Sequence, residues 1–168
     1  MQIRDALLPE FDQESANTRK VLERVPMDKA DWRPHPKSWD MATLADHLQG
    51  IMQWALAIMN SESFDVAAPD AGRFRPDPVR TREELLARFD RNRALLRDVL
   101  AAAGDEHLMH PWALLNGAET IFTMPRVAAL RAFVLNHAVH HRGQLTVYLR
   151  MNDVPLPALY GPSADEQS

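Results

Sequence analysis

The stretch N136-H-A-V-H-H-R-G-Q144 is the most informative part of this 168-residue chain. It lies in a longer segment, residues 125–151, which is predicted to be a helix and for which Pro125 suits the first turn. His137 and His141 are four residues apart, and on a helix such residues lie on one face, one above the other. Two imidazoles placed in this way can bind the same metal ion.

Three further helices are predicted upstream, at residues 3–25, 41–60 and 81–104, because apolar residues recur there at helical spacing. Thr81 opens the last of them with a capping box, since a glutamate follows three residues later. Four long amphipathic helices in a chain of this length predict an all-α fold. We expect an up-down-type four-helix bundle that forms one domain over residues 1–168.

Two connections and the C-terminal tail add detail to this prediction. Residues 110–123 contain Asn116-Gly117 between apolar runs, which predicts a small β-hairpin inserted into the bundle. Residues 61–80 form a long connection with Pro and Asp, and such a length is typical of a lid or binding loop. The tail after Asn152 holds three prolines, so we expect it to be extended.

Composition excludes several classes of function. The net charge is −4 and no cluster of Lys or Arg is present, so we expect no nucleic-acid partner. No apolar stretch reaches the length of a membrane span, and the N-terminus lacks the apolar core of a signal peptide. We therefore expect no membrane partner and a cytoplasmic location. Cysteine is absent, so any metal here must be held by histidine, carboxylates or water.

His47 provides a third candidate ligand, because it lies on the apolar stripe of the predicted helix 41–60. An imidazole that faces a bundle core needs a partner, since an unpaired buried polar group costs about 1–3 kcal/mol. His47, His137 and His141 would satisfy one another by binding one ion. Three neutral imidazoles suit Zn²⁺, Ni²⁺ or Fe²⁺, and three protein ligands leave a coordination position open.

The other histidines and the tryptophans receive plainer interpretations. A metalloprotease motif needs Glu directly after the first histidine of the pair, and Ala138 stands there, which disfavours a peptidase. His140 is interpreted as a solvated side chain, and Arg142 as a residue with a surface ion pair. Exposure is expected for His35, His107 and His110. Packing in the core and the hairpin is expected for Trp32, Trp39, Trp54 and Trp112.

Several stretches of the chain resemble the DinB family, also called DinB/YfiT-like proteins, which are metal-binding four-helix bundles. They are W32-R-P-H-P-K-S-W39, A45-D-H-L48, H137-A-V-H-H-R-G-Q-L145, and V154-P with Y160-G-P-S-A-D-E166. The resemblance covers most of the chain, and the H-H-R-G-Q block with an upstream histidine is quite specific. It implies a core metal held by His47, His137 and His141, frequent homodimers and a bacterial cytoplasmic setting.

The resemblance also implies an activity, because relatives include thiol-dependent enzymes that use bacillithiol, mycothiol or glutathione. Some of these are S-transferases and one is a maleylpyruvate isomerase. A metal-dependent thiol S-transferase is therefore the first functional hypothesis, with a small-molecule thiol and an electrophile as partners. Bound metal lowers the pKa of a coordinating thiol, and the absence of cysteine fits a thiol that comes from outside the chain. Arg142 is a possible contact for an anionic thiol.

Two alternatives remain open from the residues. The first is a non-enzymatic metal-binding or stress-response protein, in which the metal would contribute mainly to stability. The second is a metal-dependent hydrolase that uses metal-bound water. Hydrolysis needs a nearby base, for which Asp165 and Glu166 in the tail are candidates, whereas Asp46 is expected to point elsewhere on its helix.

Overall fold

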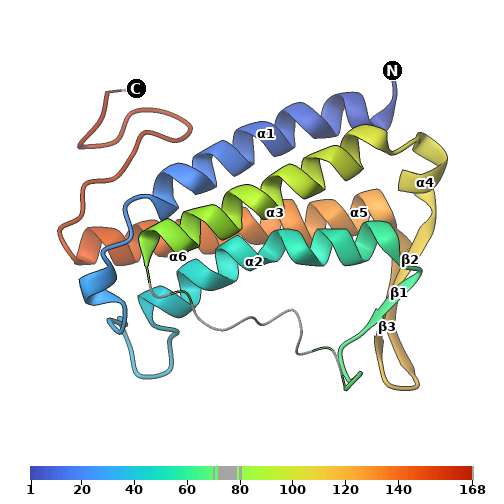
Figure 1. Ribbon diagram of the computed structural model, residues 1–168, viewed down its shortest axis with the longest axis horizontal. Coiled ribbons are helices and arrows are strands. Elements are labelled where there is room, and N and C mark those ends of the chain that lie inside the picture. The colour runs from blue at the N-terminus through green and yellow to red at the C-terminus, as the bar shows by residue number, and fades with distance from the viewer. Residues whose placement is uncertain (70, 72–78, 80, 168) are drawn as a thin grey trace.

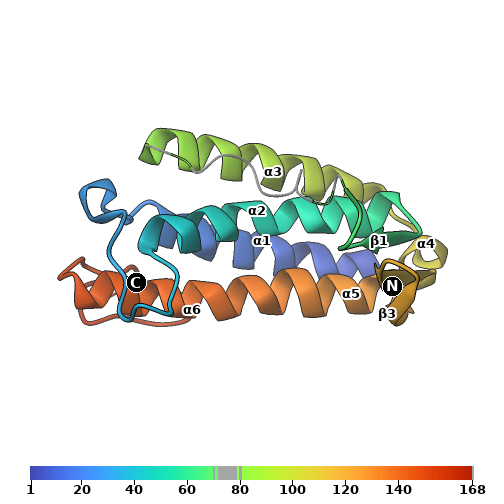
Figure 2. The ribbon, with the colours of Figure 1, turned by 90° about the horizontal axis from the view of Figure 1, so that it is seen from below.

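Four long helices make up most of the computed structural model, which describes residues 1–69, 71, 79 and 81–167. They are α1 (Ile3–Leu22), α2 (Met41–Asn60), α3 (Arg82–Ala102) and a C-terminal helix that ends with α6 (Asn136–Met151). The helices lie along a common direction (Figures 1 and 2), and both α1 and α2 pack against α3 and α6. The predicted four-helix bundle is confirmed, but its consecutive helices do not all alternate in direction as the expected up-down order requires.

The directions of the helices explain the long connection after α2. α2 and α3 run in the same direction, towards the small sheet, whereas α1 and α6 run away from it (Figure 1). Two helices that follow each other in parallel require a connection that returns along the bundle, and this accounts for the length of residues 61–80. The proposed role of that connection as a lid depends in part on residues 70, 72–78 and 80, which lie outside the described part of the chain.

Local sequence signals fix the starts of two helices. The carboxylate of Asp40 caps α2 by accepting a hydrogen bond of 2.8 Å from the Thr43 amide. The hydroxyl of Thr81 caps α3 by accepting one of 3.1 Å from the Glu84 amide, as its sequence motif predicts. Asp40 thereby fixes the entry of the chain into α2, the helix that carries His47.

The C-terminal helix contains a feature that the sequence pattern did not predict. It comprises α5 (Arg126–Leu130), a π-helical segment (Arg131–Leu135) and α6 without a break. A π-helical turn inserts an extra residue into an α-helix, rotates the following side chains and occurs frequently at functional sites. Here it ends two residues before His137, so it sets the direction in which the α6 side chains face α2.

A three-stranded sheet closes one end of the bundle. Its strands are β1 (Ser63–Asp65), β2 (Pro111–Asn116) and β3 (Glu119–Pro125), in the order β1-β2-β3. The β2–β3 pair is the predicted hairpin, but its turn is one residue later, at Gly117 with φ 62° and Ala118. β1 was not predicted and pairs in parallel with β2. Short helical segments complete the fold: η1 (Met27–Lys29) and α4 (Asp105–Met109).

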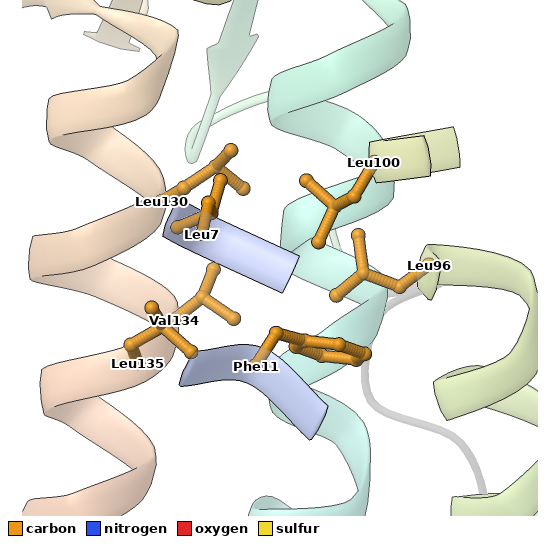
Figure 3. Close-up of a pocket in the computed structure, with 7 residues that line it drawn as sticks. All are labelled: Leu7, Phe11, Leu96, Leu100, Leu130, Val134 and Leu135. Carbon is orange, nitrogen blue, oxygen red and sulfur yellow. The ribbon is translucent and has the colours of Figure 1, made fainter. Parts of the chain in front are cut away.

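The core at the sheet end of the bundle is apolar and closely packed. A void of about 10 Å³ lies between α1, α3 and the C-terminal helix, and Figure 3 shows the side chains that line it. Its lining is entirely apolar: Leu7, Phe11, Leu96, Leu100, Leu130, Val134 and Leu135. A void of this size without polar groups offers nothing to a ligand. No helix of the described residues combines the length and apolarity that a membrane span needs.

Candidate metal centre

The structure brings the three predicted histidines together at one point between α2 and α6. The Nε2 atoms of His47 and His137 are 3.3 Å apart, and those of His137 and His141 are 2.8 Å apart. Ligand atoms of all three side chains lie within 4.8 Å of one another, and all three side chains are half-buried. We call His47, His137 and His141 the histidine triad. Among the residues that the structure describes, it is the only cluster of three or more His, Cys, Asp or Glu side chains that could hold a metal ion.

The spacing of these nitrogen atoms fits a single metal ion. With metal–nitrogen bonds of about 2.0–2.1 Å, two ligand nitrogens lie about 3.3 Å apart at tetrahedral angles and about 2.9 Å apart at right angles. The separations of 3.3 and 2.8 Å agree closely with these two values. Three histidines also leave room for a further ligand, which is the pattern of catalytic rather than structural metal sites.

Hydrogen bonds on the far side of two rings favour metal binding. His137 Nδ1 donates to the backbone oxygen of Phe133 at 3.3 Å, and His141 Nδ1 pairs with Oε1 of Gln144 at 2.7 Å. A ring that carries its proton on Nδ1 presents a bare lone pair at Nε2, as a metal requires. Two such lone pairs at 2.8 Å repel each other unless a cation lies between them.

Burial keeps two members of the histidine triad uncharged. It lowers the pKa of His137 below the usual value of 6.5, with His140 adding to this effect and the Phe133 carbonyl opposing it. Burial also lowers the pKa of His141, an effect that the hydrogen bond with Gln144 opposes. Both rings are therefore neutral at pH 7, which is the form that binds a metal.

These pKa shifts predict a pH-dependent stability for the metal-free protein. An imidazole whose pKa is lower in the folded state takes up a proton more readily when the chain unfolds. Its contribution to stability is complete above the unfolded pKa of about 6.5 and is lost as the pH falls towards the folded value. We expect the free energy of unfolding, measured with urea, to fall between about pH 7 and pH 5. The His137→Gln, His141→Gln variant should show a smaller decrease, and equal decreases in both proteins would contradict the expectation.

Trp39 corrects one of the sequence predictions. It was expected to pack in the core or the hairpin, but its side chain is 48% exposed. Its ring stacks on His141 with a centroid separation of 5.6 Å and contacts His47 at 4.9 Å. The residue lies in the connection between α1 and α2, where a sequence pattern gives no sign of a neighbour on α6. The aromatic residue type was visible in the sequence, but its position at the metal centre was not.

The other three tryptophans pack as expected. Trp112 is 1% exposed and sits beside Phe122 of the hairpin, with ring centroids 6.2 Å apart. Trp54 contacts Phe64 at 4.7 Å. Trp32 places an edge against the Tyr148 ring at 5.4 Å.

Arg142 is not the surface residue that the sequence suggested. It is 2% exposed and donates hydrogen bonds to the Glu14 backbone oxygen at 2.8 Å and to Thr18 Oγ1 at 3.1 Å. Its second nitrogen donates to the Glu14 carboxylate at 2.5 Å and to the hydroxyl of Tyr160. Arg142 therefore joins α6, α1 and the C-terminal tail, and its guanidinium is occupied by protein groups rather than presented to an external anion.

The carboxylates considered as bases are directed away from the histidine triad. Asp46 accepts a hydrogen bond of 3.0 Å from Gln49 and lies 4.0 Å from Arg88 of α3, as expected for a side chain that points elsewhere. Burial raises the pKa of Asp46. In the tail, Asp165 pairs with Arg150 at 2.5 Å, and Glu166 pairs with Arg24 of α1. The tail does fold back, but it does so through these ion pairs.

The remaining histidines lie outside the histidine triad. His35, His107 and His110 are exposed, as predicted. His110 pairs with Glu62 at 2.8 Å near the sheet. His140 is exposed and touches the His141 ring at a centroid separation of 4.9 Å.

This fold and this cluster define a class of protein, the helical bundles in which three histidines from two facing helices can bind a divalent metal. The DinB superfamily model matches residues 10–145, and the chain belongs to this superfamily. The family resemblance found in the sequence motifs is therefore confirmed.

Individual relatives match this chain over nearly their whole length. The uncharacterized protein YrdA of Bacillus subtilis (strain 168) is 24% identical over 169 residues, which cover 98% of this chain and 92% of YrdA. A DinB-like protein from Bacillus cereus ATCC 10987 superimposes with a TM-score of 0.73 at 18% identity, over 95% of this chain and 98% of that one. The DinB-like protein YjoA of Bacillus subtilis gives a TM-score of 0.68 at 18% identity, over 96% and 98% of the two chains.

Proposed function

We propose that this protein binds one divalent metal ion at the histidine triad and uses it to activate a small-molecule thiol for transfer to an electrophile. The observation that carries the proposal is the convergence of three imidazole nitrogens on one point, with separations of 3.3 and 2.8 Å. The chain contains no cysteine, so a sulfur nucleophile must come from a second molecule. Zn²⁺, Ni²⁺ and Fe²⁺ all suit three imidazoles, and the donor set does not select among them.

A divalent ion held by His47, His137 and His141 would supply a Lewis acid, which lowers the pKa of a coordinating thiol towards neutral pH. The chain's own contribution is to hold three rings in place and to keep two of them in the correct protonation state. The Phe133 carbonyl and the Gln144 side chain fix the proton on Nδ1 of His137 and His141. In the transfer, sulfur forms a new bond to carbon, the leaving group departs with its electron pair, and the thiol proton passes to solvent.

The positions of the carboxylates favour thiol transfer over hydrolysis. Metal-assisted hydrolysis needs a base beside the attacking water. Asp46 is turned towards α3, and the tail residues Asp165 and Glu166 are engaged with Arg150 and Arg24. A thiol with a lowered pKa needs no such base at neutral pH, because it is already deprotonated when it reacts.

A conjugation assay tests the proposal. Protein reconstituted separately with Zn²⁺, Ni²⁺ and Fe²⁺ is mixed with 1-chloro-2,4-dinitrobenzene and glutathione, bacillithiol or mycothiol. We expect thiol-dependent product formation above the uncatalysed rate with at least one metal and thiol, and its loss in His137→Ala. Full activity in His137→Ala would refute the metal mechanism. Metal binding without turnover would instead support a non-enzymatic metal-binding protein. Cleavage of an ester in the absence of thiol would support a hydrolase.

A further inference from the structure

We propose that Trp39 is a positioning residue of the metal centre, which holds the His47 and His141 rings in their metal-binding orientation and thereby slows release of the ion. The inference rests on the proposed metal site, and it assigns a role to a residue that contributes no metal ligand. Trp39 belongs to the connection between α1 and α2, whereas the two rings that it contacts belong to α2 and α6.

The contacts of Trp39 link two ligands from different helices. Its ring is stacked on His141 with an angle of 26° between the planes, and it is tilted by 58° against His47. An imidazole can turn about its side-chain torsions, and each turn moves Nε2 away from the shared point. An indole packed against both rings restricts these turns, because either ring would have to give up an aromatic contact.

The backbone of Trp39 is itself fixed to both helices. The Tyr148 hydroxyl, on α6, donates a hydrogen bond of 3.2 Å to the Trp39 carbonyl oxygen. The next residue, Asp40, caps α2 through its bond of 2.8 Å with the Thr43 amide. The indole is thus placed by the same two helices that carry the histidine triad.

The exposure of Trp39 separates this role from ordinary core packing. Trp112, which stabilises the hairpin, is 1% exposed, whereas Trp39 leaves 48% of its surface accessible. A large aromatic ring that serves only to fill the core stabilises the fold most when it is fully removed from water. The part of Trp39 that is removed from water includes the faces against His47 and His141.

The test measures how fast bound Zn²⁺ leaves the protein. Zinc-loaded proteins are mixed with excess 4-(2-pyridylazo)resorcinol in a stopped-flow instrument, and release is followed by the colour of the zinc complex. Because groups that orient metal ligands commonly change affinity by about 10–100-fold, we expect Trp39→Ala to release zinc about 10–100-fold faster than wild type. Trp39→Phe, which keeps an aromatic face, should release zinc at a rate close to that of wild type.

Two comparisons distinguish positioning from general stability. Leu100→Ala removes core packing at the sheet end, beside the void of Figure 3, so it should lower the melting temperature without accelerating zinc release. Tyr148→Phe removes only the hydrogen bond to the Trp39 carbonyl and should give an intermediate release rate. Release from Trp39→Ala within twofold of wild type, or equal acceleration in Leu100→Ala, would overturn the inference.

Failure of the underlying metal site has a different signature. If wild-type protein takes up no Zn²⁺, Ni²⁺ or Fe²⁺ after reconstitution, the proposed function is wrong and the role of Trp39 falls with it. If wild type binds zinc and all variants release it at one rate, the metal site stands and only the role of Trp39 is refuted.

Discussion

Untagged wild-type protein is expected to carry about one divalent metal ion per chain, and the His137→Ala, His141→Ala variant is expected to carry essentially none. The double substitution removes two of three ligands, and a single imidazole does not hold a divalent ion against dilution. The physical basis is the pair of Nε2 atoms 2.8 Å apart, which share one site. Elemental mass spectrometry after gel filtration measures the content directly.

The control for this experiment lies on the same helix. His140→Ala removes an exposed imidazole next to His141 that is not part of the histidine triad, and we expect it to leave the metal content unchanged. At a metal concentration 100 times the Kd, bound metal should also stabilise the folded wild type by about 2.7 kcal/mol, and the reconstituted protein should therefore unfold at a higher temperature than the metal-free form. Absence of metal from wild type after reconstitution would remove both the transferase and the hydrolase hypotheses.

The second large effect is expected at Arg142. Replacement by methionine should lower the free energy of unfolding by about 3–5 kcal/mol, because it leaves the Glu14 carboxylate without its partner in a largely buried position. Glu14 is 15% exposed and Arg142 is 2% exposed, so solvent screens this pair little. Tyr160 loses the hydrogen bond from Arg142 at the same time, whereas its own bond to the Glu14 carboxylate remains.

Urea unfolding of the metal-free proteins measures this effect without interference from the metal site. Arg150→Met is the matched control, since Arg150 lies two turns later on α6 and also pairs with a carboxylate, that of Asp165. The Arg150 side chain is 45% exposed. This substitution should cost less than about 1 kcal/mol, as exposed ion pairs do. Adding Glu14→Gln to Arg142→Met should recover part of the loss. A loss below about 1 kcal/mol for Arg142→Met would show that the buried pair contributes little.

The fold was predictable because its signals are local. Four segments with helical apolar spacing, the Thr81 capping box and the Asn116-Gly117 turn each depend on residues close together in the chain. The meeting of His47 with the α6 pair followed from its place on an apolar helix face. The position of β1 could not be predicted from the sequence, because its three residues become a strand only by pairing with β2, far along the chain.

The errors at the site share a physical cause. Arg142 was assigned to the surface because arginine is seldom fully buried, and its partner Glu14 stands 128 residues away. Trp39 was assigned to the core because tryptophan is large and apolar, although its neighbours are the rings of His47 and His141. Composition predicts the average surroundings of a residue type, and these two residues have surroundings that only the assembled bundle creates.

The placement of the three ligands on α2 and α6 has a consequence for biosynthesis. His47 is made early, but the other two ligands belong to the last helix of the bundle. During translation, the first three helices must therefore collapse without help from a complete metal site. An ion at the proposed site would then be acquired by a nearly finished bundle. Metal supply in the cell would control how much protein carries the ion, whereas it would have little influence on whether newly made chains begin to fold.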